Sequence, residues 1–171
     1  MGAHSAEHEL LADARAGSQQ AGRRLVAEYA PSMVRTAWNV LGRYGAHEAD
    51  DVVQEAFIAA LTTPALPAGD LGAWLRAITV RKALDSVRRA QRRAEEPLQG
   101  TEPPSNPGAE PAALAVREAL RLLAPMDRAV LTLVDLEGHS TAEAAAVLGV
   151  SSVAIRLRAV RARRRLLRWL R

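Results

Sequence analysis

The sequence contains no cysteine, which excludes disulfide bonds and cysteine-ligated zinc. Aromatic residues make up only 4% of the 171 residues, with a single phenylalanine, so a core must be built from Leu, Val and Ala. Ala and Leu favour helices over strands. No apolar run approaches the ~18 residues of a membrane span, and the first residues, MGAHSAEHELLADARAG, are too polar for a signal peptide. The composition therefore predicts an all-α, soluble, cytoplasmic protein.

Charge is distributed unevenly along the chain. The 23 basic residues outnumber the 19 acidic ones, which indicates a polyanionic partner. Residues 94–112 have the opposite character, with four acidic residues, five prolines and no basic residue. This segment has no periodic apolar pattern and predicts a flexible, Pro-rich acidic linker. We therefore expect two small helical domains, at residues 1–93 and 113–171.

The sequence pattern of residues 138–171 predicts a helix-turn-helix. Ser140 and Glu143 have the spacing of a capping box, and Gly149 suits a left-handed helix end. Ser151 or Ser152 can cap the second helix, which contains eight arginines and no acid up to the C-terminus. Its expected inner row consists of Ile155, Ala159, Ala162, Leu166 and Leu170. A cationic second helix favours the DNA major groove. The alternatives are a solvated basic helix or a general helical hairpin.

The N-terminal domain begins with a helical pattern from Ser18 to Leu41, in which Pro31 is expected to kink or restart the helix. A further helix is predicted over residues 47–61, HEADDVVQEAFIAAL. Its outward face combines two acidic residues and an amide at helical spacing: Asp51, Gln54 and Glu55. Taken alone, this stretch is best interpreted as a well-capped helix with a solvated acidic face. A metal site built from His47, Glu48, Asp50, Asp51 and Glu55 is a weaker alternative, because a di-metal bundle site needs Glu-x-x-His on two helices.

Residues 71–93 predict another cationic helix, which Asp70 can cap. It has seven basic residues and one acid, Asp85. A single basic helix commonly just presents its charges to solvent and has no binding role. Two of them, in separate domains with an acidic linker between, indicate a protein that holds nucleic acid at two places. The chain shows no nucleophile with a paired base, no phosphate loop and no metal cluster, so we predict no catalytic residue, cofactor or metal.

Three stretches in this order resemble the bacterial sigma-70 family, specifically its extracytoplasmic-function (ECF) sigma factors. DDVVQEAFIAAL is similar to region 2.2, and WLRAITVRKALDSVRR is similar to regions 2.3 and 2.4. The third stretch, LAPMDRAVLTLVDLEGHSTAEAAAVLGVSSVAIRLRAVRARRRL, is similar to region 4. The resemblance covers nearly the whole chain, with the linker where the family has one.

The resemblance implies a subunit that directs core RNA polymerase to promoters and initiates transcription. Its partners would be the polymerase core (β′ clamp and β subunits), promoter DNA and an anti-sigma factor. The implied polymerase-binding residues are Asp51, Gln54 and Glu55. Those near the −10 element are Trp74, Arg81, Lys82, Arg88 and Arg89, and the loop 62–70 corresponds to the family's segment that receives an extruded −10 base. Those near the −35 element are Ser152, Arg156, Arg158, Arg161, Arg163, Arg164 and Arg165.

Within the −35 set, Arg156, Arg158 and Arg161 are expected in or beside the major groove. Residues 163–165 are expected on phosphates. The chain departs from the family pattern at Arg81, where Asn is usual, and at Leu157 and Ala159, where Ser and Leu are commoner. Two other hypotheses remain: a stand-alone helix-turn-helix transcriptional regulator, and a sigma-like decoy that binds an anti-sigma protein.

Overall fold

The computed structural model describes residues 2–64, 67, 69–93 and 111–170, and every element in them is helical. The N-terminal half contains α1 (Gly2–Arg15), α2 (Gln19–Leu41), a short 3₁₀ turn (Gly42–Tyr44), α3 (Gly45–Thr62) and α4 (Leu71–Arg92). The C-terminal half contains α5 (Pro111–Arg121), α6 (Pro125–Leu131), a π-helical turn (Thr132–Leu136), α7 (Thr141–Leu148) and α8 (Ser152–Trp169). The all-α prediction is confirmed. Residues 94–110 of the predicted linker lie outside the described residues.

Side-chain caps mark the starts of the long helices α2, α4 and α8. The Ser18 hydroxyl accepts a hydrogen bond from the Ala21 amide at the start of α2, and Asp70 caps α4 as predicted. At α8 the cap is Ser151, whose hydroxyl accepts from the Ala154 amide at 3.2 Å. Each cap satisfies a backbone donor that the first helical turn leaves free.

Pro31 does not restart the helix as expected, because α2 runs through it without a break. Proline costs a helix about 3 kcal/mol by removing a backbone donor and crowding the preceding turn. Leu25 and Met33, on either side of Pro31, are at most 1% exposed, and full burial of each stabilises by about 1.5–3 kcal/mol. Burial of the flanking face therefore outweighs the proline penalty.

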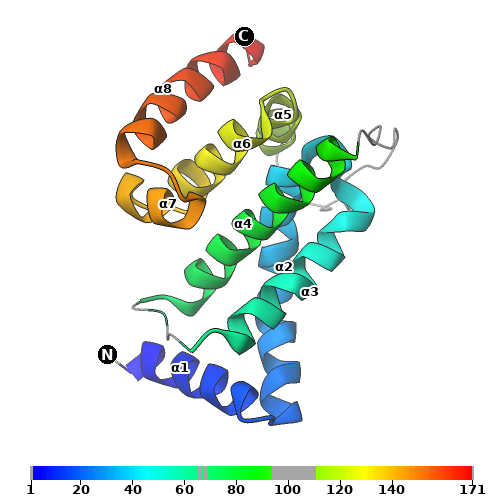
Figure 1. The fold of residues 1–171 in the computed structure, drawn as a ribbon, viewed down its shortest axis with the longest axis vertical. Coiled ribbons are helices and arrows are strands. Elements are labelled where there is room, and N and C mark those ends of the chain that lie inside the picture. Colours follow the sequence, from blue (N-terminus) through cyan, green and yellow to red (C-terminus); the bar gives the residue numbers. More distant parts are fainter. Residues whose placement is uncertain (1, 65–66, 68, 94–110, 171) are drawn as a thin grey trace.

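The helix-turn-helix has the predicted geometry. Ser140 and Glu143 form both hydrogen bonds of the capping box, and Gly149 ends α7 in the left-handed conformation, with φ +67°. The hydrogen bonds to the Ser140 side chain and backbone lower the pKa of the Glu143 carboxyl. One expected core position is wrong: Leu170 is 41% exposed, because the buried row of α8 ends before it and Figure 1 shows that end of α8 reaching past α6.

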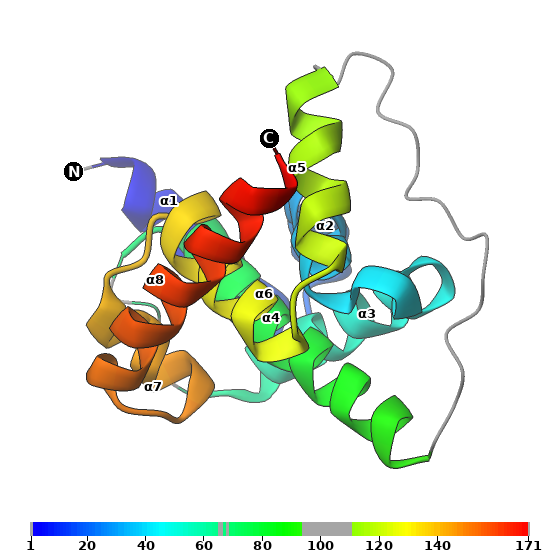
Figure 2. The same cartoon turned by 90° about the horizontal axis from the view of Figure 1, so that it is seen from above.

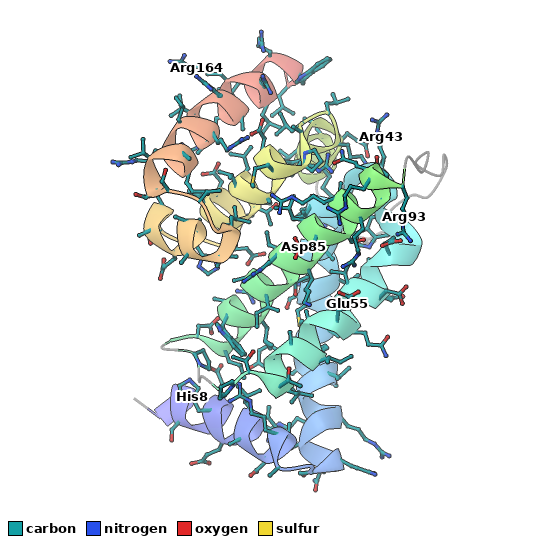
Figure 3. All side chains as sticks on the ribbon, in the orientation of Figure 1. His8, Arg43, Glu55, Asp85, Arg93 and Arg164 are labelled. Carbon is teal, nitrogen blue, oxygen red and sulfur yellow. The ribbon has the colours of Figure 1, made fainter. Side chains whose placement is uncertain are left out.

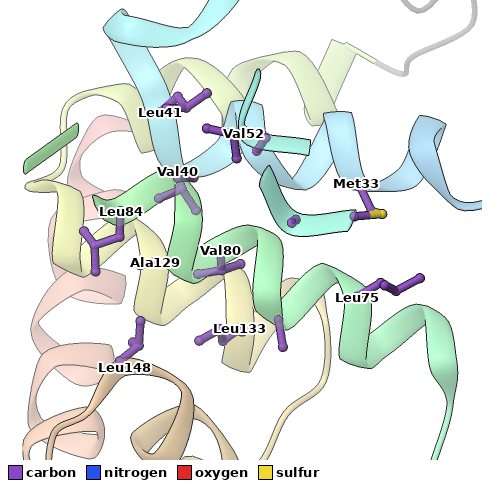
Figure 4. Close-up of a cluster of buried hydrophobic side chains, with 14 of the residues drawn as sticks. Met33, Val40, Leu41, Val52, Leu75, Val80, Leu84, Ala129, Leu133 and Leu148 are labelled. Atoms are coloured by element: carbon purple, nitrogen blue, oxygen red, sulfur yellow. The ribbon is translucent and has the colours of Figure 1, made fainter. Parts of the chain in front are cut away.

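The two halves share one apolar core. Figure 4 shows Val80 and Leu84 of α4 beside Ala129, Leu133 and Leu148 of the C-terminal half. Helix α6 contacts both α2 and α4, and α7 contacts α4. Figures 1 and 2 show α4 passing between the other N-terminal helices and the C-terminal half. The halves are thus packed against one another in this structure.

Candidate functional site: an acidic face and two cationic helices

The outward face of α3 carries the predicted acidic set. Asp51 and Gln54 are exposed, whereas Glu55 is half-buried and contacts two cations of α4. Glu55 Oε1 lies 3.2 Å from Arg89 Nη2, and Glu55 Oε2 lies 3.9 Å from Lys82 Nζ. Figure 3 shows Glu55 on α3, with α4 beside it. One predicted polymerase-binding residue is therefore ion-paired with two predicted −10 residues.

The structure divides the five predicted −10 residues into two groups. Trp74, Arg81 and Lys82 line a depression of about 360 Å³, which Val147 of α7 also lines. Arg89 points instead to Glu55. Arg88 Nη1 lies 3.5 Å from Oδ1 of Asp85, which is three residues earlier on α4. The depression continues to Thr63, at the start of the loop 62–70. Residues 65, 66 and 68 of that loop lie outside the described residues.

Three arginines of α8 are held by acids of the C-terminal half. Asp127, 6% exposed, accepts from Arg158 Nη1 at 3.1 Å and from Arg165 Nη1 at 3.3 Å. Asp135 accepts from Arg163 through Nε at 3.0 Å and Nη2 at 2.6 Å, and this bidentate hydrogen bonding raises the pKa of Arg163. These contacts tie α8 to α6 and to the π-helical turn.

The remaining α8 arginines face outward. Within the described part of the chain, no carboxylate lies within 4.0 Å of the guanidinium groups of Arg156, Arg161, Arg164 or Arg168. Figure 3 shows Arg164 extending away from the rest of the molecule. Ser152, another predicted −35 residue, is half-buried at the first position of α8.

Two polar residues between the halves, buried Arg128 and partly buried Glu137, were not predicted. Arg128, 4% exposed, donates to the carbonyl oxygens of Val40 at 2.8 Å, Leu41 at 3.3 Å and Leu123 at 2.7 Å. Burial lowers its pKa to about 10. Glu137 accepts from the Thr36 hydroxyl at 2.7 Å and from Arg76 Nε. These partners lie 61 to 101 residues away from Glu137, so no local spacing in the sequence indicated them.

The metal alternative gains no support from these contacts. Glu48 accepts a hydrogen bond from Ser86, and Glu55 is paired with α4. Over the described residues, no three His, Asp or Glu side chains gather in a way that could hold an ion. The described helices also include none with the length and apolarity needed to cross a bilayer.

Comparison with known proteins identifies the class of this chain. Residues 25–93 match the family described as Sigma-70 region 2, and residues 113–166 match Sigma-70, region 4. The ECF RNA polymerase sigma factor SigM of Mycobacterium tuberculosis is 34% identical over 165 residues, covering 95% of this chain and 83% of SigM. The sigma factor CnrH of Cupriavidus metallidurans is 31% identical over 185 residues, covering 97% and 95%.

Solved structures agree with this assignment. CnrH in complex with the cytosolic domain of CnrY superposes with a TM-score of 0.58 at 29% identity, over 95% of this chain and 96% of CnrH. The sigma factor RpoE of Bartonella quintana, in complex with the anti-sigma factor NepR, shares the fold, with a TM-score of 0.68 at 22% identity over 86% of this chain and 95% of RpoE. The chain belongs to the sigma-70 family. Within that family it is an ECF RNA polymerase sigma factor.

Proposed function

We propose that the two halves of this sigma factor divide promoter recognition between them. The N-terminal half binds core polymerase through the acidic face of α3 and contacts the −10 element through α4. The C-terminal half contacts the −35 element through α8. The observation that carries the proposal is the set of outward α8 arginines that have no carboxylate partner among the described residues, because such cations are available to neutralise DNA phosphates.

The protein acts by binding alone, in the cytoplasm, and performs no chemical step. Trp74, Arg81 and Lys82 surround a depression into which an unstacked base fits. Arg88 and Arg89 lie further along α4, where they support the backbone of the opened strand. The structurally similar RpoE was solved in complex with an anti-sigma factor, and we include an anti-sigma factor among the partners of this protein.

Binding both promoter elements requires the halves to separate. The two elements are roughly 25 base pairs apart, or about 85 Å at ~3.4 Å per base pair. A packed chain of this length has a radius of gyration of only about 16 Å. Val147 of α7 also lines the depression that we assign to the −10 strand. A strand that enters this depression therefore needs α7 to move away from α4.

Transcription in vitro with purified core polymerase tests the proposal. Promoter-dependent transcripts that require this protein are the expected result. The main alternative, a stand-alone helix-turn-helix regulator, predicts nanomolar binding to duplex DNA without polymerase, and that result would overturn the proposal. The alternative leaves the match of residues 25–93 to region 2 without a role. The decoy hypothesis predicts anti-sigma binding with no transcript at any promoter.

Tethering tests the separation step, and a chain without cysteine suits it. Thr36→Cys with Glu137→Cys places two thiols across the contact between the halves, where a short bismaleimide can join them. The joined protein should bind core polymerase yet lose promoter opening. Arg24→Cys with Glu28→Cys, joined in the same way along the exposed surface of α2, is the control. Undiminished promoter opening by the Thr36–Glu137 tether would contradict the separation step.

A further inference from the structure

The outward face of α8 is apolar along its centre. Val153, Leu157 and Val160 are 63%, 49% and 42% exposed. Their spacing of four and three residues places them on one side of the helix, opposite the buried Ile155, Ala159 and Ala162. No other described helix covers them, because α8 packs on α5, α6 and α7 through its buried side. We call these three residues the apolar strip.

Free arginines border the apolar strip. At 100° per residue, Arg156 lies on one side of the strip and Arg161 and Arg168 lie on the other, while Arg164 continues its line toward the C-terminus. As noted above, none of these four arginines has a carboxylate partner in the described residues. A helix with its side chains is about 10–12 Å wide, and the major groove is ≈ 12 Å wide. With α8 in the major groove, as proposed above, the cationic borders would match the two phosphate backbones and the strip would face the floor of the groove.

The groove floor offers one distinctive apolar group, the C5-methyl of thymine. The other base-edge groups are hydrogen-bond donors and acceptors. A donor or acceptor covered by Leu157 or Val160 would lose its water without gaining a partner, which is unfavourable. A thymine methyl at the same place would be buried favourably against these side chains.

From this geometry we propose that Leu157 and Val160, with Val153, select thymine in the −35 element by covering its methyl group. This inference rests on the proposed placement of α8 at the −35 element and adds to it a sequence preference. Arginine contacts to guanine or phosphate then supply the remaining affinity, and the apolar strip sets which base pairs are accepted under the centre of the helix. A protein partner on the same strip would need acids to match the four arginines, which makes DNA the better complement.

Removal of the methyl groups one at a time tests the proposal. Promoters are first selected by the holoenzyme, formed from core polymerase and this protein, from a duplex library randomised over the −35 and −10 windows. Each selected −35 thymine is then replaced by uracil, which keeps every hydrogen-bonding group and lacks only the methyl. Binding by the wild-type holoenzyme should weaken about three- to fivefold at one or more positions, the factor expected for one buried CH₂-sized group.

We call the loss of binding on replacing thymine by uracil the uracil penalty. Leu157→Ser should abolish the uracil penalty at one of those positions while leaving the penalty at the others. Val160→Thr, nearly isosteric, should reduce the penalty at a neighbouring position. Leu122→Ser, which removes a 58% exposed leucine in the turn after α5, is the matched control and should change nothing. Both α8 side chains are exposed, so these variants should fold, and circular dichroism checks that they do.

The outcomes separate this inference from the function on which it rests. Selection of a defined −35 sequence without any uracil penalty would overturn the thymine inference and leave the promoter function intact. Failure to select any −35 sequence would contradict the assignment of α8 itself. A Leu157→Ser holoenzyme that loses core affinity, while the uracil penalty persists, would show that the strip binds protein rather than thymine.

Discussion

Helices α4 and α8 have similar charge patterns but different surroundings. In α4, eleven of 22 residues are buried, because α2 and α3 pack on one side and α6 and α7 on the other. In α8, three of 18 residues are buried, and one side of the helix faces solvent. Cations of α4 are shared with the acidic face of α3, whereas four α8 arginines have no acid within the described residues. Charge pattern alone does not tell which cations are available to DNA; the acids contributed by neighbouring helices decide it.

Leucine truncation should give the largest difference between the helices. Leu75 of α4 is fully buried, so Leu75→Ala should lower the free energy of unfolding by about 3 kcal/mol, through lost burial and a cavity. Leu157→Ala, in the solvent-facing side of α8, should change it by less than about 0.5 kcal/mol. Urea denaturation followed by circular dichroism measures both. Equal effects would mean that α8 is covered in solution.

Removal of a carboxylate that pairs with arginines of each helix should have a smaller effect. Asp127→Asn deprives Arg158 and Arg165 of their shared acid, whose side chain is 9% exposed, and should destabilise the protein by about 1–2 kcal/mol. Asp85→Asn removes the partner of Arg88 on α4. Because both side chains of that pair are 44% exposed, the loss should be below about 0.5 kcal/mol. The same denaturation experiment ranks them, and the reverse order would contradict the assignment of Asp127 as the anchor of α8.

Cap removal should affect the two helices alike. Asp70→Ala and Ser151→Ala each free a backbone donor in the first turn, so each should cost about 1 kcal/mol. Asp70→Asn and Ser151→Thr, which keep an acceptor, should restore most of the stability. A much larger loss of unfolding free energy for Asp70→Ala would indicate that the Asp70 carboxylate also stabilises Arg76. Asp70 Oδ1 lies 3.9 Å from Arg76 Nη2.

The local features of this fold could be predicted from the sequence, since caps, glycine ends and apolar periodicity depend on residues within a few positions of one another. Ser140, Gly149 and Asp70 illustrate this, and the three buried positions of α8 follow from periodicity. The contacts of Arg128 and Glu137 could not be predicted, because their partners come from distant segments that meet only in the packed molecule. The same limit applies to Arg158: its position suggested DNA, and only the location of α6 shows that Asp127 holds it here.

Double-mutant cycles should reveal the smallest difference between the helices, in the strength of single ion pairs. Arg163 and Asp135 make a bidentate contact, for which we expect a coupling of about 1 kcal/mol. Arg89 and Glu55 meet through one contact at 3.2 Å, with side chains 43% and 41% exposed, so solvent screening should reduce their coupling to about 0.3–0.5 kcal/mol. Both couplings are measured by urea denaturation, at low and high salt, of the single and double variants Arg163→Gln with Asp135→Asn and Arg89→Gln with Glu55→Gln. Both couplings should decline as salt rises.

The weak Arg89–Glu55 ion pair suits the proposed function, because polymerase must displace it to reach Glu55 and DNA must displace it to reach Arg89. A coupling for Arg89–Glu55 as strong as that for Arg163–Asp135 would make such displacement costly and would favour a purely structural role for the α4 pair.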